Sequence, residues 1–254
     1  MNNHDINIHP KLSKPIVYEV EFQLQIEETT NLKDDLLSIT TALKDSFPKV
    51  QKKHSRAIRV PINKDSGEFE YKDLDFDDDE HFVRFISEDG GKILSLSQKS
   101  IVFLYSHGDW RWEDIREYLL NGLSSIQLST RMVPTSAALI YRNRIDWQEK
   151  VHEKYISPWL MPDIHSQSPF GVPIGAGASR AFGDIGEFLA VEVTFPMADE
   201  NGDEYLHIEF QSFSEIPTDS STMSDILYKI EYMHDSIYNL FRYSTTEKFM
   251  EDHR

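Results

Sequence analysis

The chain has 254 residues, of which 39% are hydrophobic and 12% aromatic, and its formal net charge is −17. This length and aromatic content suit a folded protein with a substantial core and argue against disorder. The acidic balance makes duplex nucleic acid and anionic membrane surfaces poor partners, and the absence of cysteine excludes disulfides, thiol nucleophiles and zinc–thiolate sites.

The start of the chain is polar. Residues 1–14 contain no apolar segment of the kind found in a secretory signal, and no apolar run in the chain reaches the roughly 20 residues that span a bilayer. We therefore expect a flexible N-terminus over 1–14 and a soluble, cytoplasmic protein.

Residues 15–28 alternate between apolar and polar side chains, which predicts a long β-strand with one polar face. The apolar face is expected to hold Ile16, Tyr18, Val20, Phe22, Leu24 and Ile26, and the polar face Val17, Glu19, Glu21, Gln23 and Gln25. Apolar residues then recur at helical spacing over 29–50, and Pro48 is expected to end this helix.

The next segments predict antiparallel strands followed by a helix. The stretch 56–62 is expected to form a strand, and 81–106 three more, with the turn sequence EDGG between two of them. Residues 109–123 carry apolar side chains at helical spacing, which predicts a helix with Trp112, Ile115, Leu119 and Leu123 on its buried side.

The second half of the chain repeats this order of elements. A long strand is predicted over 135–147, a short helix over 148–156, a long Gly- and Pro-rich loop over 157–186, and a hairpin from 187 to 213. A long helix follows from about residue 223. Ser244 and Glu247 have the spacing of a capping box for a short final helix.

These elements predict an α+β fold with a largely antiparallel sheet and helices packed on one face. Strand, helix, strands and helix occur twice, so we expect two similar halves, about 15–126 and 127–254, that form a single unit and share one sheet. Two separate domains divided near 125–130 are the alternative.

Several segments resemble metal or phosphate sites only in part. The acidic run 72–82 departs from a calcium-binding EF-hand loop because Asp78 replaces the required glycine and Arg84 the last glutamate. The acidic stretch 199–204 lies between two predicted strands and is typical of a hairpin turn. The Gly-rich stretch 171–186 lacks the spacing of a phosphate-binding loop, and the ten histidines form no metal-binding motif. No metal, cofactor or catalytic residue is predicted.

The segment LIYRNRIDW, residues 139–147, is the main candidate binding site. As a strand it places Arg142 and Arg144 on one face, about 7 Å apart, where they could bind carboxylates or phosphates. The alternative is a structural role in which they pair with acidic residues of neighbouring strands. The nominated binding residues are Tyr141, Arg142, Asn143, Arg144 and Trp147, and the nominated structural partners are Glu19 and Glu21, with Glu192 as a further acid nearby.

Three segments, in this order, resemble a sporadically distributed bacterial family of uncharacterised proteins about as long as this chain. They are KPIVYEVEFQLQI near the start, LIYRNRIDW in the middle and YKIEYMHDSIYNLFRYSTTEKF near the end. The matching positions are Pro15, Glu19, Tyr141, Asn143, Arg144, Ile145, His234, Phe241, Thr245 and Thr246. The order Tyr141–Arg142 departs from the Arg–Tyr order of the family. The resemblance implies a single integrated unit and a mobile accessory gene of defence or toxin–antitoxin islands.

The functional expectation is a non-enzymatic protein-binding or regulatory accessory protein of the bacterial cytosol. It would engage a protein partner through its sheet face and the 157–186 segment, without a cofactor. One alternative is a phosphoryl-ligand or RNA-binding protein, with or without hydrolytic activity, that uses Arg142 and Arg144. A second alternative is chaperone-like capture of a partner chain on a sheet face or edge. The sequence leaves the oligomeric state open.

Overall fold

The computed structural model describes residues 16–27, 32–55, 58–59, 75–76, 80–97, 99–106, 111–127, 133–146, 151–160, 176–184, 186–217 and 222–253. The segment 1–14, Trp147 and most of the acidic run 72–82 lie outside these ranges, so the predictions made for them are not tested.

The described residues form eleven strands and five helices. The strands are β1 (Val17–Ile26), β2 (Lys49–Ser55), β3 (Ile58–Arg59), β4 (Asp75–Phe76), β5 (Glu80–Ile86), β6 (Lys92–Leu96), β7 (Ser100–Tyr105), β8 (Pro134–Asp146), β9 (Ala176–Asp184), β10 (Glu187–Ala198) and β11 (Glu204–Glu215). The helices are α1 (Leu32–Leu43), α2 (Trp112–Gln127), α3 (Val151–Tyr155), α4 (Met223–Ser244) and α5 (Glu247–Asp252).

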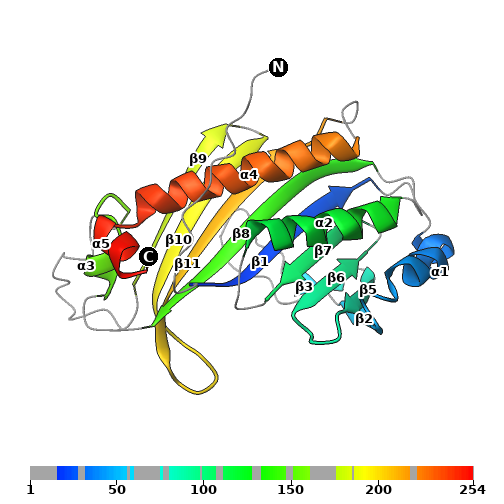
Figure 1. Cartoon of the computed structure of the whole chain (residues 1–254), viewed down its shortest axis with the longest axis horizontal. Coiled ribbons are helices and arrows are strands. Elements are labelled where there is room, and N and C mark those ends of the chain that lie inside the picture. Colours follow the sequence, from blue (N-terminus) through cyan, green and yellow to red (C-terminus); the bar gives the residue numbers. More distant parts are fainter. Residues whose placement is uncertain are drawn as a thin grey trace.

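Nine of the strands form one antiparallel sheet in the order β2-β5-β6-β7-β1-β8-β11-β10-β9, and β3 pairs with β4 separately. β1 and β8 lie side by side near the middle, although they are far apart in the sequence (Figure 1). The prediction of an α+β fold with a largely antiparallel sheet and a long C-terminal helix is confirmed.

Helices α2 and α4 lie across the same face of the sheet (Figure 1), which we call the helix face. On α4 the buried residues recur at helical spacing, as they must for one side of the helix to cover the sheet. They are Ile226, Ile230, Met233, Ile237, Leu240 and Ser244. On α2 the close approach to β7 occurs at Gly122, where an added Cβ would lie 2.9 Å from Phe103 Cζ.

A β-bulge changes the predicted faces of the first strand. The register of β1 against β8 shifts between Val17 and Glu19, so Tyr18 is the extra residue. Val17 consequently packs against the core, while Tyr18 reaches His207 on the opposite face, which we call the polar face. The prediction that Tyr18 shares the apolar face and Val17 the polar face is therefore wrong. From Val20 to Ile26 the predicted apolar positions are buried.

Three strands were not predicted from the sequence: β2, β9 and the two-residue β4. The segment 157–186, expected to be a loop throughout, contains β9, which pairs with β10 along its whole length. Its sequence AGASRAFGD has small residues and two glycines in place of alternating bulky ones, so it carries a weak strand signal. β2 pairs with β5, but its sequence KVQKKHS is mostly polar.

The cap of the last helix differs from the expected one. Ser244 is the last, buried residue of α4, and Thr246 is the N-cap of α5, where its hydroxyl accepts a hydrogen bond from the Phe249 N–H. The chain remains extended at Thr245 and Thr246, which moves the cap two residues beyond the predicted position.

The hairpin turn predicted at 199–204 is confirmed. The stretch 199–204 forms a hairpin turn in which the Asp199 carboxylate accepts hydrogen bonds from the Asn201 and Asp203 N–H groups, and Gly202 has φ +84°. Among the described residues, none of the helices has both the length and the apolar character needed to cross a membrane.

Candidate functional site

The strand that carries the nominated binding residues, β8, lies inside the sheet between two long strands. β8 pairs with β1 on one side and with β11 on the other. Its side chains alternate as predicted, so Tyr141 and Asn143 point to the helix face while Arg142 and Arg144 point to the polar face. The site is therefore two surfaces, one on each side of the sheet.

Arg142 is surrounded by three carboxylates. Its Nη1 donates to Glu19 Oε1 at 2.5 Å and to Glu21 Oε2 at 2.7 Å, both on β1. Its Nε donates to Glu209 Oε2 at 2.8 Å on β11. The arginine thus joins three adjacent strands. Only 22% of its side chain is exposed, so these contacts are made in partial shelter from water.

The charge balance determines what this cluster can bind. Burial works against the charge of Arg142, but the hydrogen bonds and charges of Glu21, Glu209 and Glu19 outweigh it and raise the pKa of the guanidinium. One positive charge among three carboxylates leaves a local excess of negative charge. An incoming phosphate would have to displace these carboxylates and would meet their repulsion.

Arg144 has its own acidic partners. Its Nη1 donates to Asp199 Oδ2 at 2.9 Å, Asp146 lies 3.7 Å from its Nε, and its guanidinium stacks over the Tyr205 ring at 4.5 Å. The hydrogen bond from Arg144 and those from backbone N–H groups lower the pKa of Asp199. Arg144 therefore anchors the β10–β11 turn to β8.

On the helix face, Tyr141 belongs to a cluster of polar and aromatic side chains. Its hydroxyl lies 2.9 Å from His234 Nδ1 on α4, and the His234 ring stacks on Trp112 of α2 with centroids 3.9 Å apart. Trp112 Nε1 donates to Glu231, which also pairs with Arg116. Burial, followed by the charge of Glu231, raises the pKa of Tyr141 well above its ordinary value. This cluster links α2, α4 and β8.

Asn143 has a structural role that its position explains. It is 2% exposed and pairs with Val17, next to the bulge at Tyr18. Its Nδ2 donates to the carbonyl oxygens of Ile208 at 3.0 Å and Tyr141 at 3.3 Å. The buried amide is therefore satisfied by backbone carbonyls, and none of these contacts requires an outside ligand.

Three members of these surfaces were not among the site residues nominated from the sequence, although His207 and Glu209 were expected on one face of a strand as surface cross-strand partners. Glu209 completes the cluster around Arg142, Asp199 holds Arg144, and His207 contacts Tyr18. Burial lowers the pKa of His207 despite the nearby Glu209 and Glu192. The alternation of β11 does place Glu209 and His207 on one face, but only the strand order shows which residues they oppose.

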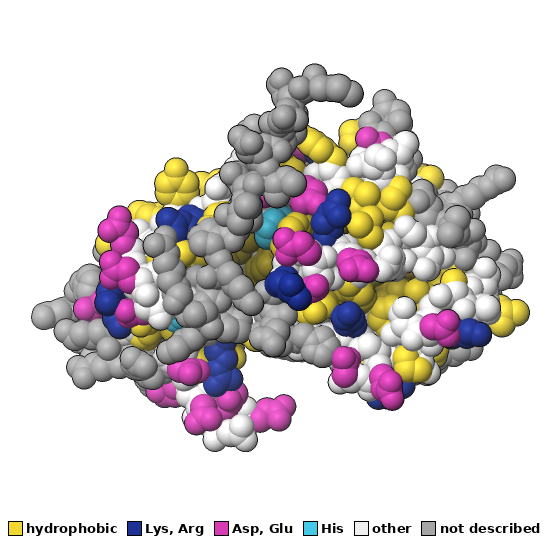
Figure 2. All heavy atoms as spheres, viewed as in Figure 1, with side chains coloured by type: hydrophobic (Ala, Val, Ile, Leu, Met, Phe, Trp, Pro, Cys, Tyr) yellow, Lys and Arg dark blue, Asp and Glu magenta, His cyan; other side chains and the backbone are white. Residues whose placement is uncertain are grey.

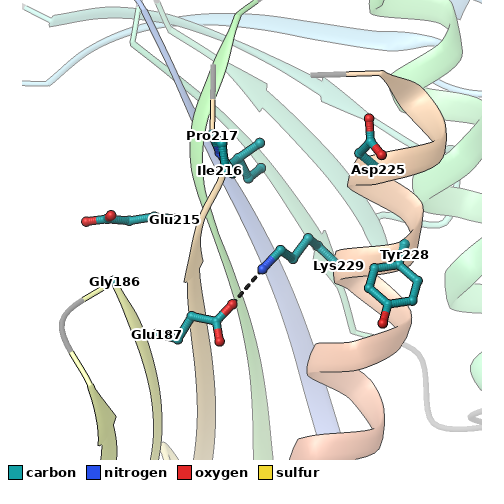
Figure 3. Close-up of a pocket in the computed structure, with 8 residues that line it drawn as sticks. All are labelled: Gly186, Glu187, Glu215, Ile216, Pro217, Asp225, Tyr228 and Lys229. Atoms are coloured by element: carbon teal, nitrogen blue, oxygen red, sulfur yellow. Dashed lines mark hydrogen bonds and ion pairs between the residues drawn. The ribbon is translucent and has the colours of Figure 1, made fainter. Parts of the chain in front are cut away.

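One pocket lies between the first turns of α4 and the facing ends of β10 and β11. It is a hollow of about 390 Å³. Lys229 reaches from α4 to Glu187, while Glu215 points away from the helix (Figure 3). Ser214 also accepts a hydrogen bond from Lys229, and the hydrogen bonds from Lys229 and Ser214 lower the pKa of Glu187. Lys229, Glu187 and Ser214 thus bind one another at this hollow.

A third surface lies at the edge of the sheet. β9 ends the strand order, so one of its sides has no neighbouring strand in the nine-stranded sheet. Near its end, Phe182 is 45% exposed and contacts Trp159, which is 38% exposed. Trp159 Nε1 donates to the carbonyl oxygen of Tyr243 on α4 at 2.7 Å. We call Trp159, Phe182 and Tyr243 the β9 edge patch.

Figure 2 shows charged side chains of both signs among the described residues on the side that carries α2 and α4. Acidic side chains are spread over this side with lysines and arginines among them (Figure 2). Within the described ranges, no group of three or more His, Asp or Glu residues is arranged to hold a metal ion.

Comparison with known proteins adds no relative. No protein-family model matches the chain, and a search of curated proteins found no match. The resemblance to the sporadically distributed bacterial family therefore stays a prediction.

Proposed function

We propose that this is a non-enzymatic, protein-binding accessory protein of the bacterial cytosol, and that a partner chain binds at the β9 edge patch. The observation that carries the proposal is the position of Phe182: a half-exposed aromatic ring on a sheet edge, in contact with a second half-exposed ring. A role in defence or toxin–antitoxin systems rests on the family resemblance alone.

Two physical properties of the patch support protein binding. An edge strand presents unpaired N–H and C=O groups that can hydrogen bond to an added strand. Large aromatic side chains supply much of the binding energy at protein interfaces because they bury a large area with few rotatable bonds. Trp159 is already held by its hydrogen bond to Tyr243, so less conformational entropy is lost when it is covered.

The arginine strand supports the phosphoryl-ligand alternative less well. The carboxylates of Glu19, Glu21 and Glu209 satisfy Arg142, and Asp199 binds Arg144. These contacts favour a role in joining β1, β8 and β11. Strand capture at the β9 edge is the mode of binding that the chaperone-like alternative would also use.

The protein is further proposed to consist of two similar halves, about 15–126 and 127–254. The support is the strand order: β1 lies beside β7 and β8 beside β11, so the first strand of each half neighbours its last. A helix follows the last strand in each case, α2 after β7 and α4 after β11. The β1–β8 pair would then join the halves.

The test is co-expression with the proteins encoded beside this gene, followed by size-exclusion chromatography. The proposal expects at least one of them to co-elute with the chain. Trp159→Ala and Phe182→Ala should each weaken that complex while the circular dichroism spectrum stays unchanged. If no complex forms with any neighbouring product, the proposed heterologous partner is wrong.

Tyr228→Ala is the matched control. Tyr228 is 64% exposed and lies on the same helix as Tyr243, but about 22 Å along the helix axis. Loss of an exposed aromatic side chain there should leave the complex intact. Equal weakening by Tyr228→Ala and Phe182→Ala would show that binding does not depend on the β9 edge patch.

A further inference from the structure

β9 lacks three of the features that commonly protect an exposed edge strand. Edge strands are commonly short, interrupted by proline, or lined with lysines. β9 has nine residues, no proline and no lysine. Residues 179–183 are all exposed. Among the described residues no strand pairs with the outer side of β9, so this side can accept another strand.

The side chains of β9 divide into two different faces. The register against β10 sets Arg180 opposite Val191 and Phe182 opposite Leu189, so both point to the helix face. The residues that alternate with them, Ser179, Ala181 and Gly183, are small and lie on the polar face. β9 thus has one face with the ring of Phe182 and the charge of Arg180, and one face with small side chains only.

We propose that the occupant of this edge is a second copy of the chain, paired antiparallel so that the two Phe182 residues face each other across a two-fold axis. This inference rests on the proposed function, because it takes the β9 edge patch as a protein-binding surface. A two-fold interface uses the same patch on both copies, so the patch must be complementary to itself.

The sequence of β9 is complementary to itself in this register. When Phe182 faces its own copy, position 180 of one chain faces position 184 of the other. Arg180 then lies opposite a residue of opposite formal charge, Asp184, on both sides of the axis. Opposite charges at directly facing positions stabilise antiparallel pairs, and like charges destabilise them.

Two nearby registers, centred on Arg180 and on Ala181, fit less well. A shift that centres the pair on Arg180 brings the two guanidinium groups face to face. Centring it on Ala181 sets Arg180 opposite Phe182 and leaves the small side chain of Ala181 at the axis.

The proposed register has one cost. In the structure Arg180 donates to the carbonyl oxygen of its neighbour Ser179 at 3.1 Å, and this hydrogen bond is lost when Arg180 reaches across the axis.

The aromatic rings would lie at the centre of the interface. With Phe182 at the axis, its contact partner Trp159 and that of the second copy lie on either side, on the helix face. On the polar face, Phe188 pairs with Gly183, which has no side chain to cover it, and is 40% exposed. Apolar groups near the axis with charges outside them match the usual anatomy of an interface.

A charge-reversal cycle tests the register by analytical ultracentrifugation of the full chain. Arg180→Asp or Asp184→Arg alone should weaken the dimer about 10- to 30-fold, because each sets like charges opposite each other twice. The double variant should restore it. Registers centred on Ala181 or Arg180 predict no such restoration, so its absence would overturn the proposed register.

Cysteine crosslinking supplies a second measurement, since the chain has no native cysteine. In the proposed register the two Cα atoms at position 182 lie about 4.5–5.5 Å apart, within reach of a disulfide. Phe182→Cys should therefore form a disulfide-linked dimer on oxidation. Ser179→Cys, on the same exposed strand, should not, because its two copies lie about 20 Å apart.

The outcomes separate this inference from the proposed function. A wild-type chain that stays monomeric at high concentration, with no crosslink at position 182, overturns the dimer. If Phe182→Ala still weakens a complex with a neighbouring gene product, the edge binds a different chain and the proposed function stands. If the chain dimerises through β9 but no neighbouring gene product binds it, the dimer stands and the proposed heterologous partner is wrong.

Discussion

Arg142 on β8 donates a hydrogen bond to Glu21 on β1 at 2.7 Å, which ties together two strands that lie more than a hundred residues apart in the chain. The same guanidinium reaches Glu209 on β11. Arg142, one of the nominated binding residues, is thus paired with carboxylates of neighbouring strands in its own sheet.

This relationship predicts that Arg142→Ala destabilises the fold. The change leaves three partly sheltered carboxylates without a cation, so we expect a loss of about 2 kcal/mol in the free energy of unfolding, between the values for exposed and buried pairs. Urea denaturation measures it. Arg144→Ala is the matched control and should cost less than about 1 kcal/mol, because Arg144 is more exposed than Arg142 and has one close carboxylate, Asp199, in place of three. Equal losses would contradict the special role of Arg142.

Asn143→Ala tests the buried amide. The substitution removes the donors that satisfy the carbonyl oxygens of Ile208 and Tyr141 beside the β1 bulge. Leaving a buried carbonyl unsatisfied costs about 1–3 kcal/mol, which is the expected loss of stability. Thermal unfolding followed by circular dichroism checks it. A stable Asn143→Ala variant would mean that water or a shifted backbone replaces the amide.

Gly122→Ala should destabilise the protein, although alanine has the higher helix propensity. The new methyl group would collide with the ring of Phe103, which is 1% exposed and packed between α2 and the sheet. Overpacking of this kind costs about 1–3 kcal/mol. The double variant Gly122→Ala/Phe103→Leu should recover part of the loss in urea denaturation. If Gly122→Ala is stabilising, α2 can move away from β7 at little cost.

Asp252 predicts a pH-dependent contribution to stability. Hydrogen bonds from Lys154, Lys248 and Tyr155 lower the pKa of its carboxyl well below the ordinary value. A group with a lowered pKa in the folded state stabilises the fold above its unfolded pKa, about 3.9 for aspartate, and this contribution is lost as the pH falls below that value.

The measurement compares the wild type with Asp252→Asn in urea denaturation from neutral to acidic pH. The wild type should be more stable at neutral pH, and the difference should shrink as the medium is acidified below the ordinary aspartate pKa. Glu251→Gln serves as the control, because Glu251 is exposed and makes only a longer contact, 3.6 Å, with Lys248. A difference that does not change with pH would show that the amide loses packing instead of charge.

The sequence determined most of the local structure. The alternation of β1 and β8, the helical spacing of α2 and α4, and the turns at EDGG and 199–204 depend on neighbours within a few residues, so the pattern itself carries the information. The α+β class followed from the order of those elements. β2 and β9 were not predicted from the sequence, because their strand conformation depends on pairing with β5 and β10 and their own side chains favour it weakly.

The roles of the nominated residues were decided only by the tertiary structure. Alternation placed Arg142 on the polar face, but the third carboxylate of its cluster, Glu209, became its neighbour through the strand order. The bulge at Tyr18, which reverses the faces of two residues, results from the fit of β1 against β8. Local alternation in the sequence determines which side chains share a face of a strand. The partner of a charged side chain and the exposure of an aromatic ring depend on which distant segments fold against them.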